Sequence, residues 1–462
     1  MVMMPSFLLR MKRRGGYKAR MGDRFGRYPA NILAVLSKNH QSPTPNPQHL
    51  IPNTQHPIWI HAVSVGEVQV AAQLMRAMRE RSPEVRFVFS TTSSTGWKTA
   101  ENELARLKRE GGGHDDDVLI YNPLDFGGCV KRALDQVNPC MVILTETEIW
   151  PNFIRAVKRR GIPLYLVNAR VSDRSAPRYR RLRWFFGEVL RCFTKIFAQS
   201  ELDARRLVDA GADPAAIAVT GSFKFDVAHR NEAKERELAQ WIAGAGEPGE
   251  ILLGGSTWPG EDEVLLRIYS ELVKVHPEVK LVIAPRHFEK ADAVEANIVK
   301  AGFCCVRRSR DLKGVGCQVS GLGENSQVPG VQCPTPNTQH PMPVYLCDTT
   351  GEMMGLFGIS TVAFVGKSLC AHGSQNMIEP CLCGKATLVG PYTENFRPVM
   401  SDLLSADALV QVPDEAALKK EILRFFDDPA GRAAQGARAT SAVLRRCGVV
   451  GRCADVILEA LR

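Results

Sequence analysis

The sequence predicts an α/β protein of two doubly wound, Rossmann-like domains with a cleft between them. Its 462 residues exceed one ordinary hydrophobic core, which favours two domains of ~200 residues. Short β-rich runs alternate with helical patterns, the arrangement of βαβ units and parallel sheets. The charged, Gly-containing segment 227–250 predicts a linker, which divides an N-terminal domain, 1–226, from a C-terminal domain, 251–462.

The strands that we expect are short and apolar. In the first half they lie at 58–63, 85–90, 118–121, 141–144, 163–167 and 195–198. In the second half they lie at 251–254, 280–284, 344–346, 362–365 and 386–389. A helix is expected at 68–81, where Val70, Leu74 and Met78 form one apolar stripe.

Two segments interrupt this plan. Residues 43–57 and 334–341 share a Pro-, Asn-, Gln- and His-containing repeat, and the second copy lies in a Gly/Ser-rich stretch, 307–343. The repeat is too short and too rich in proline to fold alone. We therefore expect two extended or disordered insertions.

Positive charge is concentrated in two stretches of the N-terminal half. Between Arg10 and Arg27 there are eight Lys/Arg residues and one acid, and between Arg155 and Arg183 there are ten and one. This predicts a basic surface for an anionic partner, either a membrane or phospholipid or a nucleic acid. The absence of interleaved aromatic residues and of a nucleic-acid-binding motif favours the membrane.

Composition excludes several other classes. No apolar run reaches the ~18 residues of a membrane span. The thirteen cysteines contain no CxxC pair, and no acidic motif is placed to hold a nucleotide-bound cation, so we expect reduced thiols, no metal site and no cofactor.

A Gly/Ser-rich turn follows the predicted strand 362–365. Gly366, Ser368 and Asn376 precede Glu379 at the start of an expected helix. Small residues let backbone N–H groups approach an anion, the helix N-terminus adds its positive dipole end, and Glu379 suits ribose hydroxyls. The segment predicts a binding site for a nucleotide sugar.

Acidic side chains follow strands in the first half. Glu67 opens the helix after the first strand. Two interpretations follow: its side chain faces the cleft and acts as a general base, or it only caps its helix. Glu146 and Glu148, two residues apart after the strand 141–144, are expected to point the same way. They are candidates for positioning an acceptor, although Arg170, Arg174 or Lys224 would equally neutralise them.

Nine motifs in fixed order then support a family resemblance. They are His61-Ala-Val-Ser-Val-Gly-Glu67-Val, Thr145-Glu-Thr-Glu148-Ile-Trp-Pro-Asn152, Asn168-Ala-Arg-Val-Ser172, Gly221-Ser-Phe-Lys224-Phe-Asp226, Gly255-Ser-Thr-Trp-Pro-Gly-Glu261, Ala284-Pro-Arg286-His287, Asp348-Thr-Thr-Gly-Glu352, the loop from Gly366 to Glu379, and Gly390-Pro-Tyr-Thr-Glu-Asn395-Phe. From Gly15 to about Val412 the chain resembles the 3-deoxy-D-manno-octulosonic acid (Kdo) transferases of lipopolysaccharide assembly.

The resemblance implies an inverting GT-B enzyme that moves Kdo from CMP-Kdo to the lipid A precursor, as a peripheral protein at the cytoplasmic face of the inner membrane. It favours Glu67 as the general base. Arg286 and His287 would bind the donor phosphate, although a salt bridge or a structural hydrogen bond would also explain them, and Glu352 is expected to cap a helix. The acceptor's phosphates would meet Lys18, Arg20, Arg170 and the Arg178–Arg183 cluster.

The chain departs from the family pattern at three places. The apolar anchoring helix usual before Gly15 is almost absent, so we expect a chain that begins late or membrane binding by charge alone. Lys367, Ser374 and Gln375 stand where the family usually has Gly, Gly and His, and Trp258 and Phe288 stand where His and Pro are frequent. Two alternatives follow: a GT-B transferase for another nucleotide sugar, or a non-catalytic sugar-phosphate or lipid-binding relative.

Overall fold

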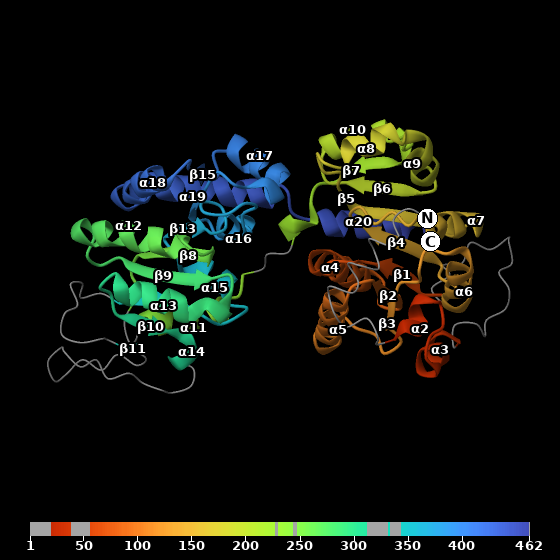
Figure 1. The fold of residues 1–462 in the computed structure, drawn as a ribbon, viewed down its shortest axis with the longest axis horizontal. Coiled ribbons are helices and arrows are strands. Elements are labelled where there is room, and N and C mark those ends of the chain that lie inside the picture. The colour runs from red at the N-terminus through yellow and green to blue at the C-terminus, as the bar shows by residue number, and fades with distance from the viewer. Residues whose placement is uncertain are drawn as a thin grey trace. The chain divides into compact units, whose positions relative to one another are not determined.

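The computed structural model describes residues 20–37, 56–226, 230–243, 247–311, 331–332 and 343–461. Two compact units divide the chain. The first contains residues 1–227 and 447–462, and the second contains residues 228–446. Each unit is an α/β domain with its own sheet and its own hydrophobic core (Figure 1). The predicted fold class is therefore confirmed.

The first unit is built on a parallel, seven-stranded sheet in the order β3-β2-β1-β4-β5-β6-β7. The chain runs outward from β1 to β3 and then returns to the other side of β1, which makes the sheet doubly wound. Its strands are β1 (Ile58–His61), β2 (Phe87–Thr91), β3 (Val118–Tyr121), β4 (Met141–Thr145), β5 (Leu164–Ala169), β6 (Lys195–Ala198) and β7 (Ile217–Val219).

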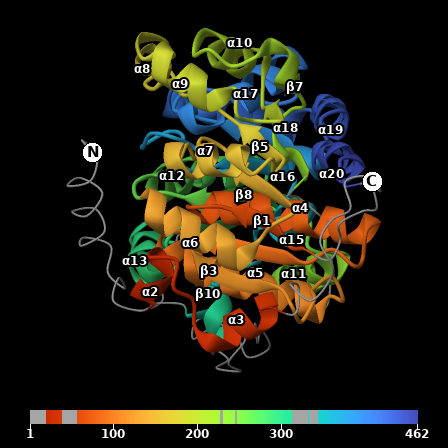
Figure 2. The same ribbon diagram turned by 90° about the vertical axis from the view of Figure 1, so that its right-hand side faces the viewer.

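Helices cover both faces of this sheet because its central strands are buried on both sides. One apolar cluster joins the sheet to α3, α6, α7 and α9, and the other joins it to α4 and α20. Figure 2 looks onto the face that α6 and α7 cover. The helices are α2 (Met21–Arg24), α3 (Ala30–Ser37), α4 (Val65–Arg81), α5 (Ser94–Arg109), α6 (Gly127–Val137), α7 (Pro151–Arg159), α8 (Ala176–Arg181), α9 (Arg183–Leu190), α10 (Glu201–Asp209) and α20 (Val449–Glu459).

The last helix, α20, corrects the predicted domain boundary, because it belongs to the first unit although the sequence placed it in the second. Val450 and Ile457 enter the core that α4 helps to form, and Arg81 pairs with Asp455 at 2.5 Å. At the start of α20, the N–H groups of Gly448 and Val450 donate hydrogen bonds to the Asp226 carboxylate. Figure 1 shows this blue C-terminal helix among the red and yellow elements of the first unit.

The second unit has an eight-stranded sheet in the order β11-β10-β12-β9-β8-β13-β14-β15, which is parallel except for β11. This sheet is also doubly wound: the chain adds strands on one side of β8 and then returns to add β13 on the other side. The strands are β8 (Ile251–Thr257), β9 (Lys280–Pro285), β10 (Cys305–Arg307), β11 (Val331–Gln332), β12 (Val344–Leu346), β13 (Val362–Val365), β14 (Ala386–Val389) and β15 (Val410–Gln411).

Helices α12, α13 and α18 pack in one apolar cluster of this unit, and α11 and α15 pack in another. Helix α11 lies inside the predicted linker 227–250, and the second unit begins at Ala228, so the prediction of a separate linker is wrong. The helices are α11 (Glu232–Ala243), α12 (Glu261–Val275), α13 (Ala291–Lys300), α14 (Arg308–Asp311), α15 (Met353–Ile359), α16 (Ile378–Leu382), α17 (Arg397–Ser405), α18 (Glu415–Asp427) and α19 (Pro429–Leu444).

All eleven predicted strands are present with ends shifted by at most three residues. Four short strands were missed, namely β7, β10, β11 and β15. The predicted insertion 307–343 begins with α14 and contains β11, so it is not wholly irregular. Most of both predicted insertions lies outside the described residues.

No helix among the described residues has the length and apolar character needed to span a bilayer. Among the residues that the structure describes, ten cysteines are free, but Cys304 is disulfide-bonded, so the prediction of reduced thiols is wrong for that residue.

Candidate functional site

Both sheets have a switch point where the strand order reverses, between β1 and β4 in the first and between β8 and β13 in the second. Ligands of open α/β sheets bind outside the carboxyl ends of the strands at such a point. Glu67, Glu146 and Glu148 follow β1 and β4. The loop that begins at Gly366 follows β13. The predicted residues therefore gather at the switch point of their own unit.

Glu67 lies in the first turn of α4, and its carboxylate caps that helix. Ser64 is the N-cap residue and accepts a hydrogen bond from the Glu67 N–H. In return, the Ser64 hydroxyl donates to Glu67 Oε1 at 2.7 Å, and the Val63 N–H donates to Oε2 at 3.0 Å. The Thr145 hydroxyl also donates to Oε2, at 3.3 Å, and Glu67 is only 8% exposed. The capping interpretation is therefore correct, and a base function would have to act in addition to it.

Three carboxylates share this edge of the first sheet; we call Glu67, Glu146 and Glu148 the carboxylate cluster. Burial, together with the negative charges of Glu67 and Glu146, raises the pKa of Glu148 to about 8. Burial and the charge of Glu67 also raise the pKa of Glu146. Because like charges at one site disfavour ionisation, the cluster holds at least one proton near neutral pH.

The backbone and two aromatic residues fix the cluster. Glu146 has a left-handed backbone with φ of 55°, which is uncommon outside glycine and is found preferentially at functional sites. The Trp150 indole N–H donates to Glu148 Oε2 at 3.0 Å, and its ring lies edge-on to His61. Pro151 begins α7.

Positive groups lie on the side of Glu146. Lys224 and Arg170 both lower the pKa of Glu146 by their charge, while burial lowers the pKa of Lys224 itself. The Asn168 side chain connects the segment of Glu146 with the segment of Lys224. Its amide donates to Glu146 at 3.5 Å, and its oxygen accepts from the N–H of Phe223, the neighbour of Lys224, at 3.1 Å. The sequence had offered Arg170 and Lys224 as neutralising partners, and these contacts agree with that interpretation.

In the second unit the loop after β13 is organised around Glu261, a residue to which the sequence gave no function. Glu261 is fully buried at the start of α12. Its carboxylate accepts hydrogen bonds from the N–H groups of Lys367 at 2.7 Å, Ser368 at 3.0 Å and Leu369 at 3.0 Å, and from the Trp258 N–H at 2.8 Å. These backbone donors are therefore engaged inside the protein and are not free for a phosphate.

Two predicted donor-binding residues consequently have other functions. The Ser368 side chain is fully buried, donates to the Val365 carbonyl at 2.5 Å and accepts from the Gly390 N–H at 2.8 Å. Gly366 lies so close to the β8 backbone that a Cβ atom would approach the Ser256 carbonyl to 2.4 Å. Both residues hold the loop against the sheet, so the prediction that they contact the nucleotide is corrected.

Asn376 and Glu379 form a pair beside this loop. The Asn376 amide donates to Glu379 at 2.9 Å, and its oxygen accepts from the Ile378 N–H at 3.1 Å. Burial raises the pKa of Glu379, whereas the hydrogen bond from Asn376 lowers it. Helix α16 has only five residues and begins at Ile378, so its dipole contributes less than the sequence suggested.

Arg286 follows β9, and its side chain is exposed. The predicted salt bridge alternative has no support, since Arg286 forms no ion pair with any described residue. The His287 ring is hydrogen-bonded to the Glu289 carboxylate at 3.1 Å. It also packs edge-on against Trp258, with ring centroids 4.8 Å apart. The Lys367 ammonium lies over the same Trp258 ring, 4.7 Å from its centroid.

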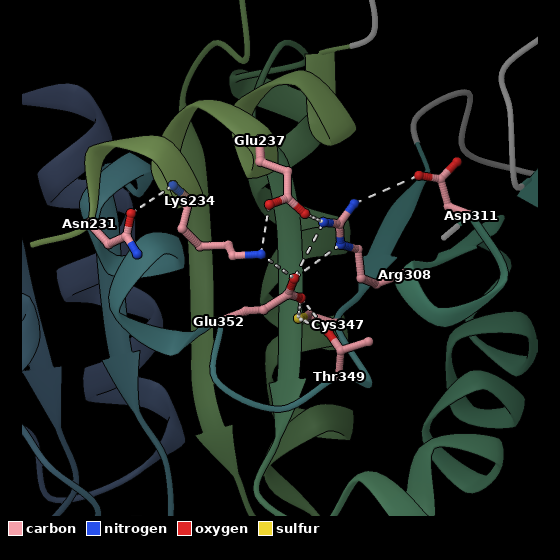
Figure 3. A network of polar contacts seen from close by, with 8 residues as sticks. All are labelled: Asn231, Lys234, Glu237, Arg308, Asp311, Cys347, Thr349 and Glu352. Carbon is pink, nitrogen blue, oxygen red and sulfur yellow. Dashed lines mark hydrogen bonds and ion pairs between the residues drawn. The ribbon is translucent and has the colours of Figure 1, made fainter. Parts of the chain in front are cut away.

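Glu352 occupies the N-cap position of α15, in agreement with the prediction, but its side chain forms no capping hydrogen bond. Figure 3 shows instead that its carboxylate points into a network with Arg308, Lys234, Cys347 and Thr349. Arg308 also pairs with Glu237 on α11 and with Asp311 at 3.8 Å. The network ties α11 and α15 together, and it is a structural element of this unit.

The predicted basic surface is only partly available. Lys18 lies outside the described residues. Arg20 pairs with Asp23 at 2.9 Å and lies 4.7 Å from the Trp97 ring, so its charge is neutralised within the protein and its predicted contact with the acceptor is corrected. By contrast, four arginines of α8 and the start of α9 are exposed, namely Arg178, Arg180, Arg181 and Arg183. Trp184, the next residue, is 76% exposed.

No group of three or more acidic, histidine or cysteine side chains with metal-binding geometry exists among the described residues.

The fold resembles that of sugar-nucleotide enzymes of the GT-B type. A glycosyltransferase from Rickettsia africae is 12% identical, with a TM-score of 0.54 over 88% of this chain and 99% of that chain. A UDP-GlcNAc 2-epimerase from Neisseria meningitidis, bound to UDP-GlcNAc, is 12% identical with a TM-score of 0.56 over the same shares. Two doubly wound units with candidate sites at their switch points thus define a protein of the GT-B class.

Sequence comparison identifies the family. The model of the 3-deoxy-D-manno-octulosonic-acid transferase (kdotransferase) family matches residues 19–227. A 3-deoxy-D-manno-octulosonic acid transferase of Bordetella pertussis is 33% identical over 88% of this chain and 87% of its own length. The enzyme of the same name from Haemophilus influenzae is 28% identical over 96% of this chain and 91% of its own length. The chain belongs to this glycosyltransferase family.

Proposed function

We propose that the protein transfers Kdo from CMP-Kdo to the lipid A precursor with inversion at the anomeric carbon. The observation that carries the proposal is the carboxylate cluster at the first switch point of a chain that belongs to the Kdo transferase family. Acidic side chains that gather at a binding edge, two of them with a raised pKa, are suited to accept a proton from a sugar hydroxyl.

In the proposed reaction the acceptor hydroxyl oxygen bonds to the anomeric carbon as the bond from that carbon to the phosphate oxygen breaks. Glu67 accepts the hydroxyl proton, and CMP leaves. Glu146 and Glu148 position the acceptor, and Arg170 contributes positive charge beside Glu146. A general base of this kind contributes ~10²–10⁴-fold to the rate.

The second unit would bind the donor. Arg286 is exposed and has no ion-pair partner among the described residues, so its guanidinium is available to bind a phosphate with two hydrogen bonds. Glu379 and Asn376 would bind the ribose, and His287 would complete the site. Because cationic side chains supply the positive charge, we expect transfer without a divalent cation.

The acceptor is a phosphoglycolipid, so we propose peripheral binding at the cytoplasmic face of the inner membrane. The exposed arginines of α8 and α9 would meet anionic headgroups, at ~1 kcal/mol for each arginine near the surface. The adjacent Trp184 has the exposure and the amphipathic ring of a residue that inserts at a membrane interface.

Two measurements test the proposal. Isothermal titration should show binding of CMP and much weaker binding of UDP, whereas a preference for UDP would support another nucleotide sugar as donor. Incubation with CMP-Kdo and a tetraacylated lipid A precursor, in buffer containing EDTA, should give Kdo-bearing product by mass spectrometry. CMP binding without any product would favour a non-catalytic relative.

A further inference from the structure

Lys367 and Trp258 contact each other at the second switch point. Trp258 follows β8 and Lys367 follows β13, the two strands between which the order of the sheet reverses. The Lys367 Nζ atom lies 4.7 Å from the Trp258 ring, and the same ring packs against His287. The two residues that depart from the family pattern at this edge therefore form one cation–π pair.

The backbone of both residues is held by the same buried carboxylate. Glu261 accepts a hydrogen bond from the N–H of Trp258 and another from the N–H of Lys367. The Lys367 carbonyl also accepts from the Ser374 N–H at 2.8 Å. These contacts fix the backbone from which the two side chains extend.

Lysine is an unfavourable residue at this position. Lys367 has φ of 56°, in the left-handed region that glycine adopts without strain. Among the described residues the Lys367 ammonium has no carboxylate partner, so no ion pair compensates for that strain. A strained backbone that carries an uncompensated charge at a binding edge points to a function for the charge.

We propose that Lys367 binds an anionic group of the sugar-nucleotide donor and that Trp258 positions its side chain. The inference rests on the proposed function, since the donor CMP-Kdo carries two anionic groups, the phosphate and the sugar carboxylate. Arg286 supplies one cation for these groups, and Lys367 supplies the second. The site thereby distinguishes an acidic sugar donor from a neutral one.

The test compares Lys367→Gly, Lys367→Met, Lys367→Arg and Trp258→His with the wild type. Lys420→Met on α18 removes an exposed lysine of the same unit and serves as the matched control. We expect the glycine and methionine variants to raise the KM for CMP-Kdo by about 10- to 100-fold. Arginine should restore most of the affinity, and Trp258→His should raise KM by about 2- to 5-fold.

Thermal unfolding separates binding from structure. Lys367→Gly removes backbone strain, so its Tm should equal or exceed that of the wild type although its donor affinity falls. A merely structural lysine would not show this combination. Inhibition by CMP then assigns the anion: a parallel rise in the inhibition constant indicates the phosphate, and an unchanged constant indicates the carboxylate.

An unchanged donor KM in Lys367→Gly and Lys367→Met would overturn the inference while leaving the proposed function intact. Wild-type protein that neither binds CMP nor transfers Kdo would instead contradict the proposed function itself. The Lys420→Met control should match the wild type in KM, in CMP inhibition and in Tm.

Discussion

Both units are doubly wound, but they carry opposite charge at their switch points. At the switch point of the first sheet lie three acids, the buried Glu67 and the half-buried Glu146 and Glu148, and burial raises the pKa of Glu146 and Glu148. At the switch point of the second sheet the buried acid Glu261 is enclosed by backbone N–H groups, and the accessible side chains are the cations Arg286 and Lys367. The first edge is suited to moving a proton, and the second is suited to holding an anion.

Backbone strain marks both edges. Glu146 follows β4 with φ of 55°, and Lys367 follows β13 with φ of 56°. Asn168 in β5 and Ser256 in β8 are also left-handed. Left-handed residues other than glycine cost on the order of 1–3 kcal/mol each, so the conformations of Glu146 and Lys367 at the two switch points point to selection by function.

The largest effect should come from the acid edge. Glu67→Gln should lower kcat by ~10²–10⁴-fold because the amide does not accept the acceptor's proton. Initial rates of Kdo transfer measure this loss. A kcat within a few-fold of the wild type would remove Glu67 as the base.

The capping function of Glu67 needs a separate control. Ser64→Ala removes the N-cap hydroxyl of α4 but keeps the Glu67 carboxylate. It should cost about 1 kcal/mol of stability and leave kcat within about tenfold of the wild type. If both variants lost activity equally, the capping contacts would explain the effect of Glu67.

The cationic edge should show a smaller effect of a different kind. Arg286→Ala should raise the KM for the donor by about 10- to 100-fold, since a charge-assisted hydrogen bond is lost. Steady-state kinetics at saturating acceptor would show it. Arg286→Lys should recover only part of the affinity, because lysine does not form the paired hydrogen bonds of a guanidinium.

The pKa of Glu148 predicts a pH dependence of stability. The unfolded chain releases this proton near the ordinary glutamate pKa of 4.5, but the folded protein keeps it until about pH 8, so the free energy of unfolding falls as pH rises between these values. Glu148→Gln removes this loss. We therefore compare the free energy of unfolding of the variant with that of the wild type at each pH. The difference should favour the variant more at pH 8.5 than at pH 5, by about 1 kcal/mol or more.

Denaturant unfolding at several pH values would measure the difference, and Glu188→Gln, at an exposed position of α9, is the control. A difference between Glu148→Gln and wild type that does not vary with pH would contradict the raised pKa.

The smallest expected effect concerns the basic surface. Arg180→Gln removes one exposed arginine of α8 and should weaken binding to anionic vesicles by about fivefold, since one arginine contributes ~1 kcal/mol. Vesicle sedimentation at two salt concentrations would show it. Binding to neutral vesicles should be weak and unaffected, whereas an equal loss on both kinds of vesicle would point to unfolding instead.

The sequence predicted the strands well because apolar runs bounded by turn residues are local signals. It missed β7 and β15, each of three residues or fewer, and it assigned α20 to the wrong unit because no local pattern states which core a terminal helix joins.

The site was predicted less completely for a similar reason. Glu261 was recognisable only as an acid at the start of a helix, and its contacts come from a loop more than one hundred residues later. Ser368 and Gly366 carried the signature of a nucleotide loop, but their close packing against β8 and β14 is a tertiary property. Residue type predicted where the site lies, and packing decided which atoms are free.

The separation of proton handling from donor binding is tested most directly by CMP affinity in two variants. Isothermal titration should give Glu67→Gln the affinity of the wild type and should give Arg286→Ala an affinity about 10- to 100-fold lower. Loss of CMP binding in Glu67→Gln, or full CMP binding in Arg286→Ala, would contradict the assignment of the two chemistries to the two units.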